Sequence, residues 1–157
     1  MAANPIERPW RGTAHDTGRP VVLRVTGRSM EPVLRRGARL QVSPTPAEAL
    51  VPGDLIVFPL GESVVCHRLI AVRGRLFHAR GDASLSMDPP VHRCQLIGRV
   101  THVLDTGWRL QSLDTTVSRR RARWRARFSL PLAAAWRLRH ALRCCPLWSH
   151  GIEWLEE

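Results

Sequence analysis

Residues 63–79 read SVVCHRLIAVRGRLFHA, a pattern typical of a β-hairpin. Ten residues rich in Val, Leu and Ile precede Arg73-Gly74, and a second apolar run follows this pair. A two-residue connection with glycine at its second position matches the tight turns that join antiparallel strands. We therefore predict two antiparallel strands, 63–72 and 75–79.

The strand pattern extends in both directions from this hairpin. Short apolar runs are separated by Gly and Pro from Val21 onward, and no helical period persists before residue 117. The other predicted strands are 21–26, 38–42, 54–58, 95–104 and 108–113. The three prolines within residues 43–52 predict a loop. The predicted fold class is mostly β, with an antiparallel β-sheet domain and a short C-terminal helical appendage.

The spacing of apolar residues changes from a strand pattern to a helical pattern after Asp114. Trp124 and Phe128 are four residues apart, and a second set of apolar residues after Pro131 shares one helical face. Two short amphipathic helices broken at Pro131 are predicted. The expected organisation is an N-terminal extension over 1–20, a β domain over 21–116 and an arginine-rich helical tail over 117–157.

Arginine dominates the charge of this 157-residue chain, whose formal net charge is +11. All 24 basic residues are arginine, and neither lysine nor tyrosine occurs. Schiff-base enzymes, Walker A phosphate loops and Ser/Lys dyads are therefore excluded. A general base acting near neutral pH has to be a histidine, a cysteine or a perturbed carboxylate.

The basic excess is concentrated in the tail, where residues 117–157 hold nine arginines and three glutamates. Such a segment suggests an acidic partner, although a solvated basic face is the plainer alternative. Trp124, among arginines, would either stack on a base or lie at a lipid interface. A peripheral membrane or acidic partner is favoured over nucleic acid.

No stretch approaches the roughly 20 apolar residues of a membrane-spanning helix, and residues 1–20 lack the apolar run of a secretory signal. We expect a cytoplasmic protein, either free in solution or bound peripherally to the membrane. The cysteines show no CxxC spacing, so neither a disulfide framework nor a zinc site is predicted. Cys66 and Cys94 are interpreted as small buried residues. His78, His92 and His102 lack metal-ligand spacing, and no cofactor is expected.

Four motifs follow one another in an informative order. A serine beside a glycine, as in Gly27-Arg28-Ser29, is by itself most often a turn or helix-capping residue. The order of the later motifs changes this interpretation. They are Ser29-Met30-x-Pro32, Gly53-Asp54, His67-Arg68, and Gly81-Asp82 with Asp88.

This ordered set resembles the type I signal peptidase family, specifically the branch that uses histidine in place of lysine as the base. The resemblance covers about residues 21–103 and ends in Gly98-Arg99-Val100, which resembles the closing strand. It implies a signal-peptidase-like β fold. The missing lysine fits the histidine branch and counts against lysine-dependent bacterial enzymes and self-cleaving SOS repressor relatives.

The resemblance assigns roles residue by residue. Ser29 would be the nucleophile and His67 the general base, because a serine hydroxyl needs an adjacent base to remove its proton. Asp88 would orient the imidazole and stabilise its charged form. Asp82 is left with two interpretations: a turn residue whose carboxylate accepts backbone N–H bonds, or a direct catalytic role.

The chain departs from the family pattern in three places. Gly27 and Arg28 replace the region where relatives carry a small hydroxyl residue that helps the oxyanion hole. The acidic motif, Gly81-Asp82-Ala83-Ser84, lacks the usual asparagine. The membrane anchor is also missing, which argues against bulk processing of exported proteins.

Three functional hypotheses follow. The first is a serine endopeptidase that cleaves a precursor peptide or protein through an acyl-enzyme. The resemblance implies that its substrate is an extended segment with small residues, bound as an added strand at a sheet edge. The alternative is a catalytically inactive basic module whose tail binds nucleic acid or anionic membrane. A self-cleaving transcriptional regulator would need a helix-turn-helix segment before Val21, for which twenty residues are too few.

Overall fold

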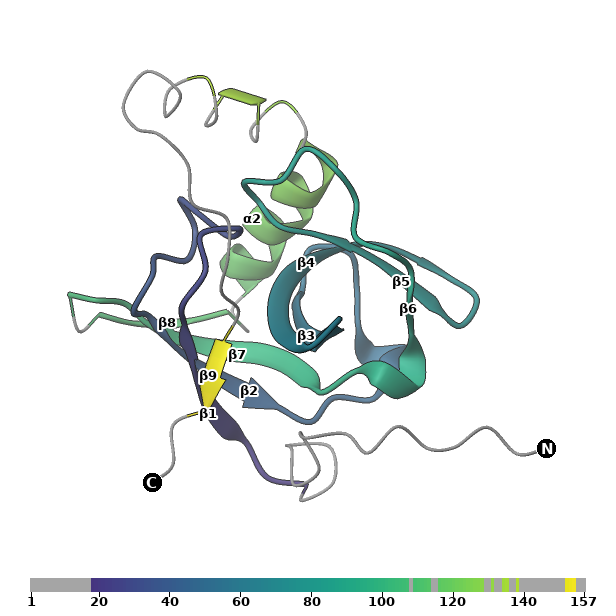
Figure 1. Ribbon diagram of the computed structural model, residues 1–157, viewed down its shortest axis with the longest axis horizontal. Helices are drawn as coiled ribbons and strands as arrows, with labels where there is room; N and C mark the ends of the chain where they lie inside the picture. Colours follow the sequence, from purple (N-terminus) through teal and green to yellow (C-terminus); the bar gives the residue numbers. More distant parts are fainter. Residues whose placement is uncertain are drawn as a thin grey trace.

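The computed structural model describes residues 18–107, 109–113, 116–128 and 152–154, together with Pro131, Ala134, Ala135 and Leu138 (Figure 1). The strands are β1 (Val21–Val25), β2 (Arg39–Ser43), β3 (Leu55–Leu60), β4 (Ser63–Arg73), β5 (Leu76–Arg80), β6 (Val91–His92), β7 (Gly98–Leu104), β8 (Leu110–Ser112) and β9 (Ile152–Trp154). Helix α2 covers Thr116–Arg127, and two short 3₁₀ turns are η1 (Ala47–Ala49) and η2 (Arg93–Gln95).

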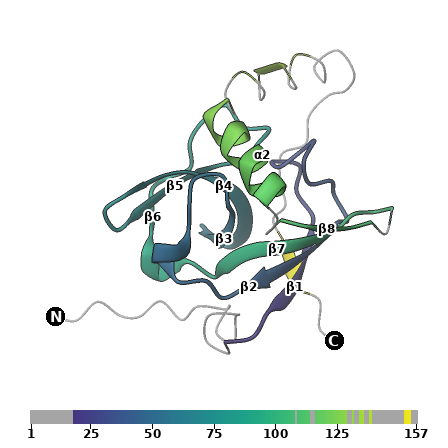
Figure 2. The same ribbon diagram turned by 180° about the vertical axis from the view of Figure 1, so that it is seen from behind.

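Within these described ranges, the strands form a single sheet in which every pairing is antiparallel. Its order is β6-β5-β4-β3-β7-β2-β1-β9, and β8 pairs with β7. The sheet curls on itself, as Figures 1 and 2 show from opposite sides. The predicted mostly β, antiparallel fold is confirmed.

The hairpin at residues 63–79 forms β4 and β5, which meet at the Arg73–Leu76 pair. Gly74 lies in the turn with φ +57°, a conformation that glycine adopts without steric cost. The strand predicted over 95–104 begins later, at Gly98, because residues 93–95 form η2. His92 and Gln95 cap that turn reciprocally.

The apolar core lies in two clusters, which β3 separates. Leu55 and Val57 belong to one cluster, whereas Ile56 and Phe58 belong to the other. Successive strand residues point to opposite faces of a sheet, so all four are buried. This explains why β3 reads as a continuous apolar run and not as an alternating pattern.

Helix α2 packs beside β4 through its small residues. Ala126 is buried, and the backbone at Ala122 lies directly over Gly53. Gly53 has φ +105°, and a Cβ there would lie 2.6 Å from the carbonyl carbon of Ala122. Glycine is therefore required both for the turn and for the close approach of the helix.

Residues 152–154 form strand β9, whereas a helical tail was predicted over 117–157. Ile152–Trp154 pairs antiparallel with β1, where Val25 faces Ile152 and Leu23 faces Trp154. An unpaired edge of β1 accounts for this pairing, since exposed backbone donors and acceptors recruit another strand. The helix predicted after Pro131 lies largely outside the described residues. The domain boundaries at residues 20 and 116 stay predictions.

We predict that Gly53→Ala destabilises the fold by more than about 2 kcal/mol, because the methyl group meets the α2 backbone and φ +105° is unfavourable for alanine. Urea unfolding measures the loss. Gly61→Ala is the matched control, because Gly61 also has positive φ but has open space around its Cβ position. Equal losses for the two variants would show that the helix does not press on Gly53.

Candidate active site

Ser29 lies in the turn that follows β1. Its neighbour Met30 is buried in the core, and the Met30 carbonyl accepts hydrogen bonds from the backbone N–H groups of Val33 and Leu34. Arg28 on the other side is exposed. The turn is therefore anchored through Met30, and it leaves Ser29 half-buried.

The loop after β5 contacts the backbone of Ser29. The backbone N–H of Ala83 donates to the Ser29 carbonyl at 2.8 Å. A Cβ at Gly81 would lie 2.6 Å from the same oxygen and 3.0 Å from the Cβ of Ser29. Because no side chain fits at Gly81, the glycine of the Gly81-Asp82 motif is explained by its contact with the serine.

His67 on β4 connects Ser29 to Asp88. Its Nε2 lies 2.8 Å from the Ser29 Oγ, and its Nδ1 lies 2.7 Å from an Asp88 carboxylate oxygen. The imidazole is buried, and its edge-to-face contact with Phe58 has a centroid distance of 6.1 Å. The Asp88 backbone N–H donates to the Ala79 carbonyl on β5. The ring is thus held at both nitrogens.

This linear arrangement is the geometry by which serine hydrolases activate a hydroxyl group. A family model described as Peptidase S24-like matches residues 5–101, which are 97 of the 157 residues. The chain belongs to the Peptidase S24-like family. The matched range includes Ser29, His67, Asp82 and Asp88. Comparison with curated proteins and with solved structures found no match.

Membership of this family confirms the predicted resemblance at the level of signal-peptidase-like serine peptidases. The further assignments, to a histidine-base branch and to precursor cleavage, go beyond family membership. They depend on the residues that surround Ser29.

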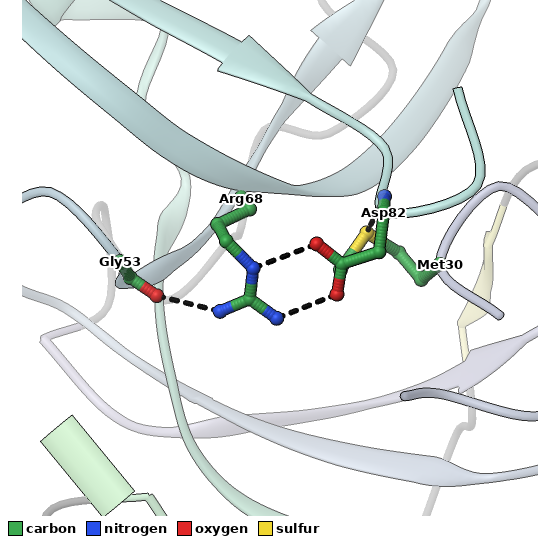
Figure 3. Close-up of polar contacts among 4 residues, drawn as sticks. All are labelled: Met30, Gly53, Arg68 and Asp82. Carbon is green, nitrogen blue, oxygen red and sulfur yellow. Dashed lines mark hydrogen bonds and ion pairs between the residues drawn. The ribbon is translucent and has the colours of Figure 1, made fainter. Parts of the chain in front are cut away.

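Figure 3 shows a buried ion pair between Arg68, the residue that follows His67 on β4, and Asp82. Arg68 donates from Nε and Nη2 to the two carboxylate oxygens of Asp82, at 2.7 and 2.6 Å. Its Nη1 donates to the Gly53 carbonyl at 2.8 Å. The side chains of Arg68 and Asp82 are only 3% and 9% exposed.

The observed role of Asp82 therefore differs from the interpretation as a turn residue. Its carboxylate accepts the guanidinium of Arg68, whereas the turn interpretation expected it to accept backbone N–H groups. The Asp82 backbone N–H lies 3.4 Å from the Met30 sulfur. The cause is the buried guanidinium of Arg68. Its planar pair of N–H donors matches the two oxygens of a carboxylate, and its charge needs such a partner when it is buried. This role of Arg68 was not predicted.

Of the remaining motif residues, Asp54 has a local structural role. Its carboxylate accepts the backbone N–H of Val51 at 2.9 Å and lies 3.8 Å from the Arg99 guanidinium. Gly98 lets β7 approach β2, because a Cβ there would lie 2.6 Å from the Ser43 carbonyl. These two motifs shape the sheet around the site and do not contact Ser29.

The two described cysteines differ from one another. Cys66 is buried as predicted, and burial raises the pKa of its thiol to about 12, so the thiolate is scarce at neutral pH. Cys94 is exposed, and the prediction that it is buried is wrong. It lies in η2 at the surface, where its backbone N–H donates to the His92 side chain. Cys144 and Cys145 lie outside the described residues.

Two of the three histidines predicted to have no metal have local partners. His92 caps η2, and the His102 Nδ1 lies 3.2 Å from the Thr101 hydroxyl. In the part of the chain that the structure describes, no group of three His, Cys, Asp or Glu side chains is arranged to hold a metal ion. The helices in that part include none long and apolar enough to cross a membrane.

We predict that Asp82→Asn lowers the free energy of unfolding by about 3–5 kcal/mol, because it leaves the Arg68 charge buried without a carboxylate. Urea unfolding at neutral pH measures the loss. The double variant Arg68→Met/Asp82→Leu removes both charges and should lose less than Asp82→Asn alone. Exposed ion pairs contribute at most about 1 kcal/mol to the free energy of unfolding. A loss below that value for Asp82→Asn would therefore contradict a structural role for the Arg68–Asp82 pair.

Proposed function

We propose that this protein is a serine endopeptidase in which His67 is the general base for Ser29 and Asp88 orients His67. The single observation that carries the proposal is the continuous contact from the Ser29 Oγ through both nitrogens of His67 to Asp88. Since the chain has no lysine, the base of lysine-dependent relatives cannot operate here. This supports the histidine-base branch.

The proposed reaction starts with neutral His67, whose Nδ1 carries its proton and donates to Asp88. Its Nε2 then accepts the Ser29 hydroxyl proton as Oγ attacks the peptide carbonyl. The resulting imidazolium returns this proton to the leaving amine, so that an acyl-enzyme and a free amine form. Water, deprotonated in turn by Nε2, hydrolyses the ester and restores Ser29.

The negative charge that develops on the substrate oxygen needs hydrogen-bond donors. The Ser29 backbone N–H has no acceptor among the described residues, so it is available for this purpose. Gly27 has no side chain to offer, and Arg28 is exposed. We therefore assign the oxyanion site to backbone N–H groups, with Ser29 as the first of them.

The proposed substrate is an extended segment of a precursor peptide or protein. An antiparallel sheet offers backbone donors and acceptors along its edges, and added-strand binding uses them without regard to most side chains. The resemblance to signal peptidases adds a preference for small residues one and three positions before the cut. The physiological precursor would be recognised by these features.

We predict that a fluorophosphonate probe labels the wild-type protein once, at Ser29, because the activated Oγ attacks phosphorus as it would a carbonyl. Intact-mass and peptide mass spectrometry measure the number and position of the adducts. Ser29→Ala should remove labelling while its urea midpoint stays near that of the wild type. Label on another residue, or unchanged labelling of Ser29→Ala, would refute Ser29 as the nucleophile.

Asp88→Asn and Asp82→Asn serve as a matched pair in the same assay, corrected for the folded fraction. Asp88→Asn should slow labelling by up to about 10⁴-fold, because the amide favours the wrong imidazole tautomer. Folded Asp82→Asn should react within about tenfold of the wild type, since Asp82 pairs with Arg68. The reverse order would exchange the roles of the two aspartates.

A further inference from the structure

The exposed side of α2 combines positive charge with aromatic surface. Its exposed arginines are Arg120, Arg121, Arg123, Arg125 and Arg127, and the helix contains no acidic residue. Trp124 is 66% exposed and Phe128 is 41% exposed. Their rings stack on one another, with centroids 4.6 Å apart and an interplanar angle of 28°.

The geometry of the helix places the aromatic pair at the centre of its outer face. Ala122 and Ala126 mark the inner face, over Gly53. At about 100° per residue, Trp124 lies about 180° from the mean direction of these alanines. Arginines therefore flank the aromatic pair on both sides. The amphipathic pattern predicted for Trp124 and Phe128 thus turns outward, away from the core.

Further apolar side chains are exposed on the loop that joins β5 to β6. Leu85 is 46% exposed and Met87 is 44% exposed. Both views of the molecule show this loop passing beside α2 (Figures 1 and 2). Exposed apolar side chains that gather on one side of a protein mark an interaction surface more often than scattered single ones do.

We propose that α2 is a docking surface for anionic lipid membranes, with Trp124 and Phe128 inserted among the headgroups and the arginines against lipid phosphates. A short helix with an apolar centre and flanking basic residues lies in the plane of such an interface. Its 12 residues span about 18 Å, and Arg120, Arg121 and Arg127 lie nearest to Trp124 around the helix. Arginine and tryptophan are well suited to this boundary.

The aromatic stacking favours a membrane over nucleic acid. Bases bind to aromatic side chains that present a free ring face. Trp124 and Phe128 cover one face of each other, which halves the ring faces open to bases, whereas a lipid boundary accommodates them as one apolar unit. The exposed Leu85 and Met87 on the neighbouring loop are apolar, and a phosphate backbone does not require apolar partners.

Docking through the outer face of α2 places the candidate active site close to the lipid. The inner face of α2 rests on Gly53, whose carbonyl accepts from Arg68, the partner of Asp82. Asp82 lies in the loop that carries Asp88. The site therefore lies behind a helix about 10–12 Å in diameter, at the membrane surface.

Vesicle co-sedimentation of the full-length protein tests this proposal. Binding is expected to vesicles of phosphatidylcholine with phosphatidylserine, and not to phosphatidylcholine alone. Arg120→Gln/Arg127→Gln should weaken it by about 25-fold, at about fivefold per arginine. Trp124→Ala/Phe128→Ala should weaken it at least tenfold. Leu110→Ala is the matched control, since Leu110 is 69% exposed on β8, and should bind as the wild type does.

Three outcomes would overturn the proposal. These are equal binding to both kinds of vesicle, full binding by folded Trp124→Ala/Phe128→Ala, and tighter binding to a DNA duplex or single-stranded RNA than to the anionic vesicles. Far-UV circular dichroism and urea midpoints identify variants that have lost the fold. Ser29→Ala should bind vesicles like the wild type, so failure of the peptidase assignment and failure of membrane docking are distinguishable.

Discussion

The buried ion pair between Arg68 and Asp82 connects three parts of the molecule whose relative positions define the candidate site. Arg68 follows His67 on β4, Asp82 lies in the same loop as Asp88, and the other partner of Arg68 is the Gly53 carbonyl beneath α2. A charge that is 3% exposed tolerates little displacement from its partner, because separation would leave it both desolvated and unpaired. The pair therefore fixes the loop of Asp88 relative to His67.

The same ion pair also connects helix α2 to the candidate active site. Glycine at position 53 allows the α2 backbone to lie against the turn, and glycine at position 81 allows the loop to lie against Ser29. Two close backbone approaches and one ion pair thus hold three segments from distant parts of the sequence around one imidazole. We infer that the rigidity of the Ser29–His67–Asp88 arrangement depends as much on these neighbours as on its own hydrogen bonds.

Several features were predictable because their signals are local. Apolar runs punctuated by glycine predicted the strands, and residues 63–79 predicted their hairpin. The partners of Arg68 were not predictable, since they lie 14 and 15 residues away and no pattern specifies which carboxylate or carbonyl a buried arginine will meet. The pairing of β9 with β1 joins residues at opposite ends of the chain. Trp124 faces outward because the Ala122 backbone lies against Gly53 and Ala126 is buried, and the spacing of apolar residues in the sequence does not reveal these contacts.

The most direct test of the central claim is the pH dependence of fluorophosphonate labelling at Ser29, because this reaction is a single chemical step without product release. Protonated imidazole cannot accept the hydroxyl proton, so the wild-type rate should rise with pH and then level off. His67→Ala should label much more slowly and lose this rise. A flat wild-type profile, or the same rise in folded His67→Ala, would contradict histidine as the base.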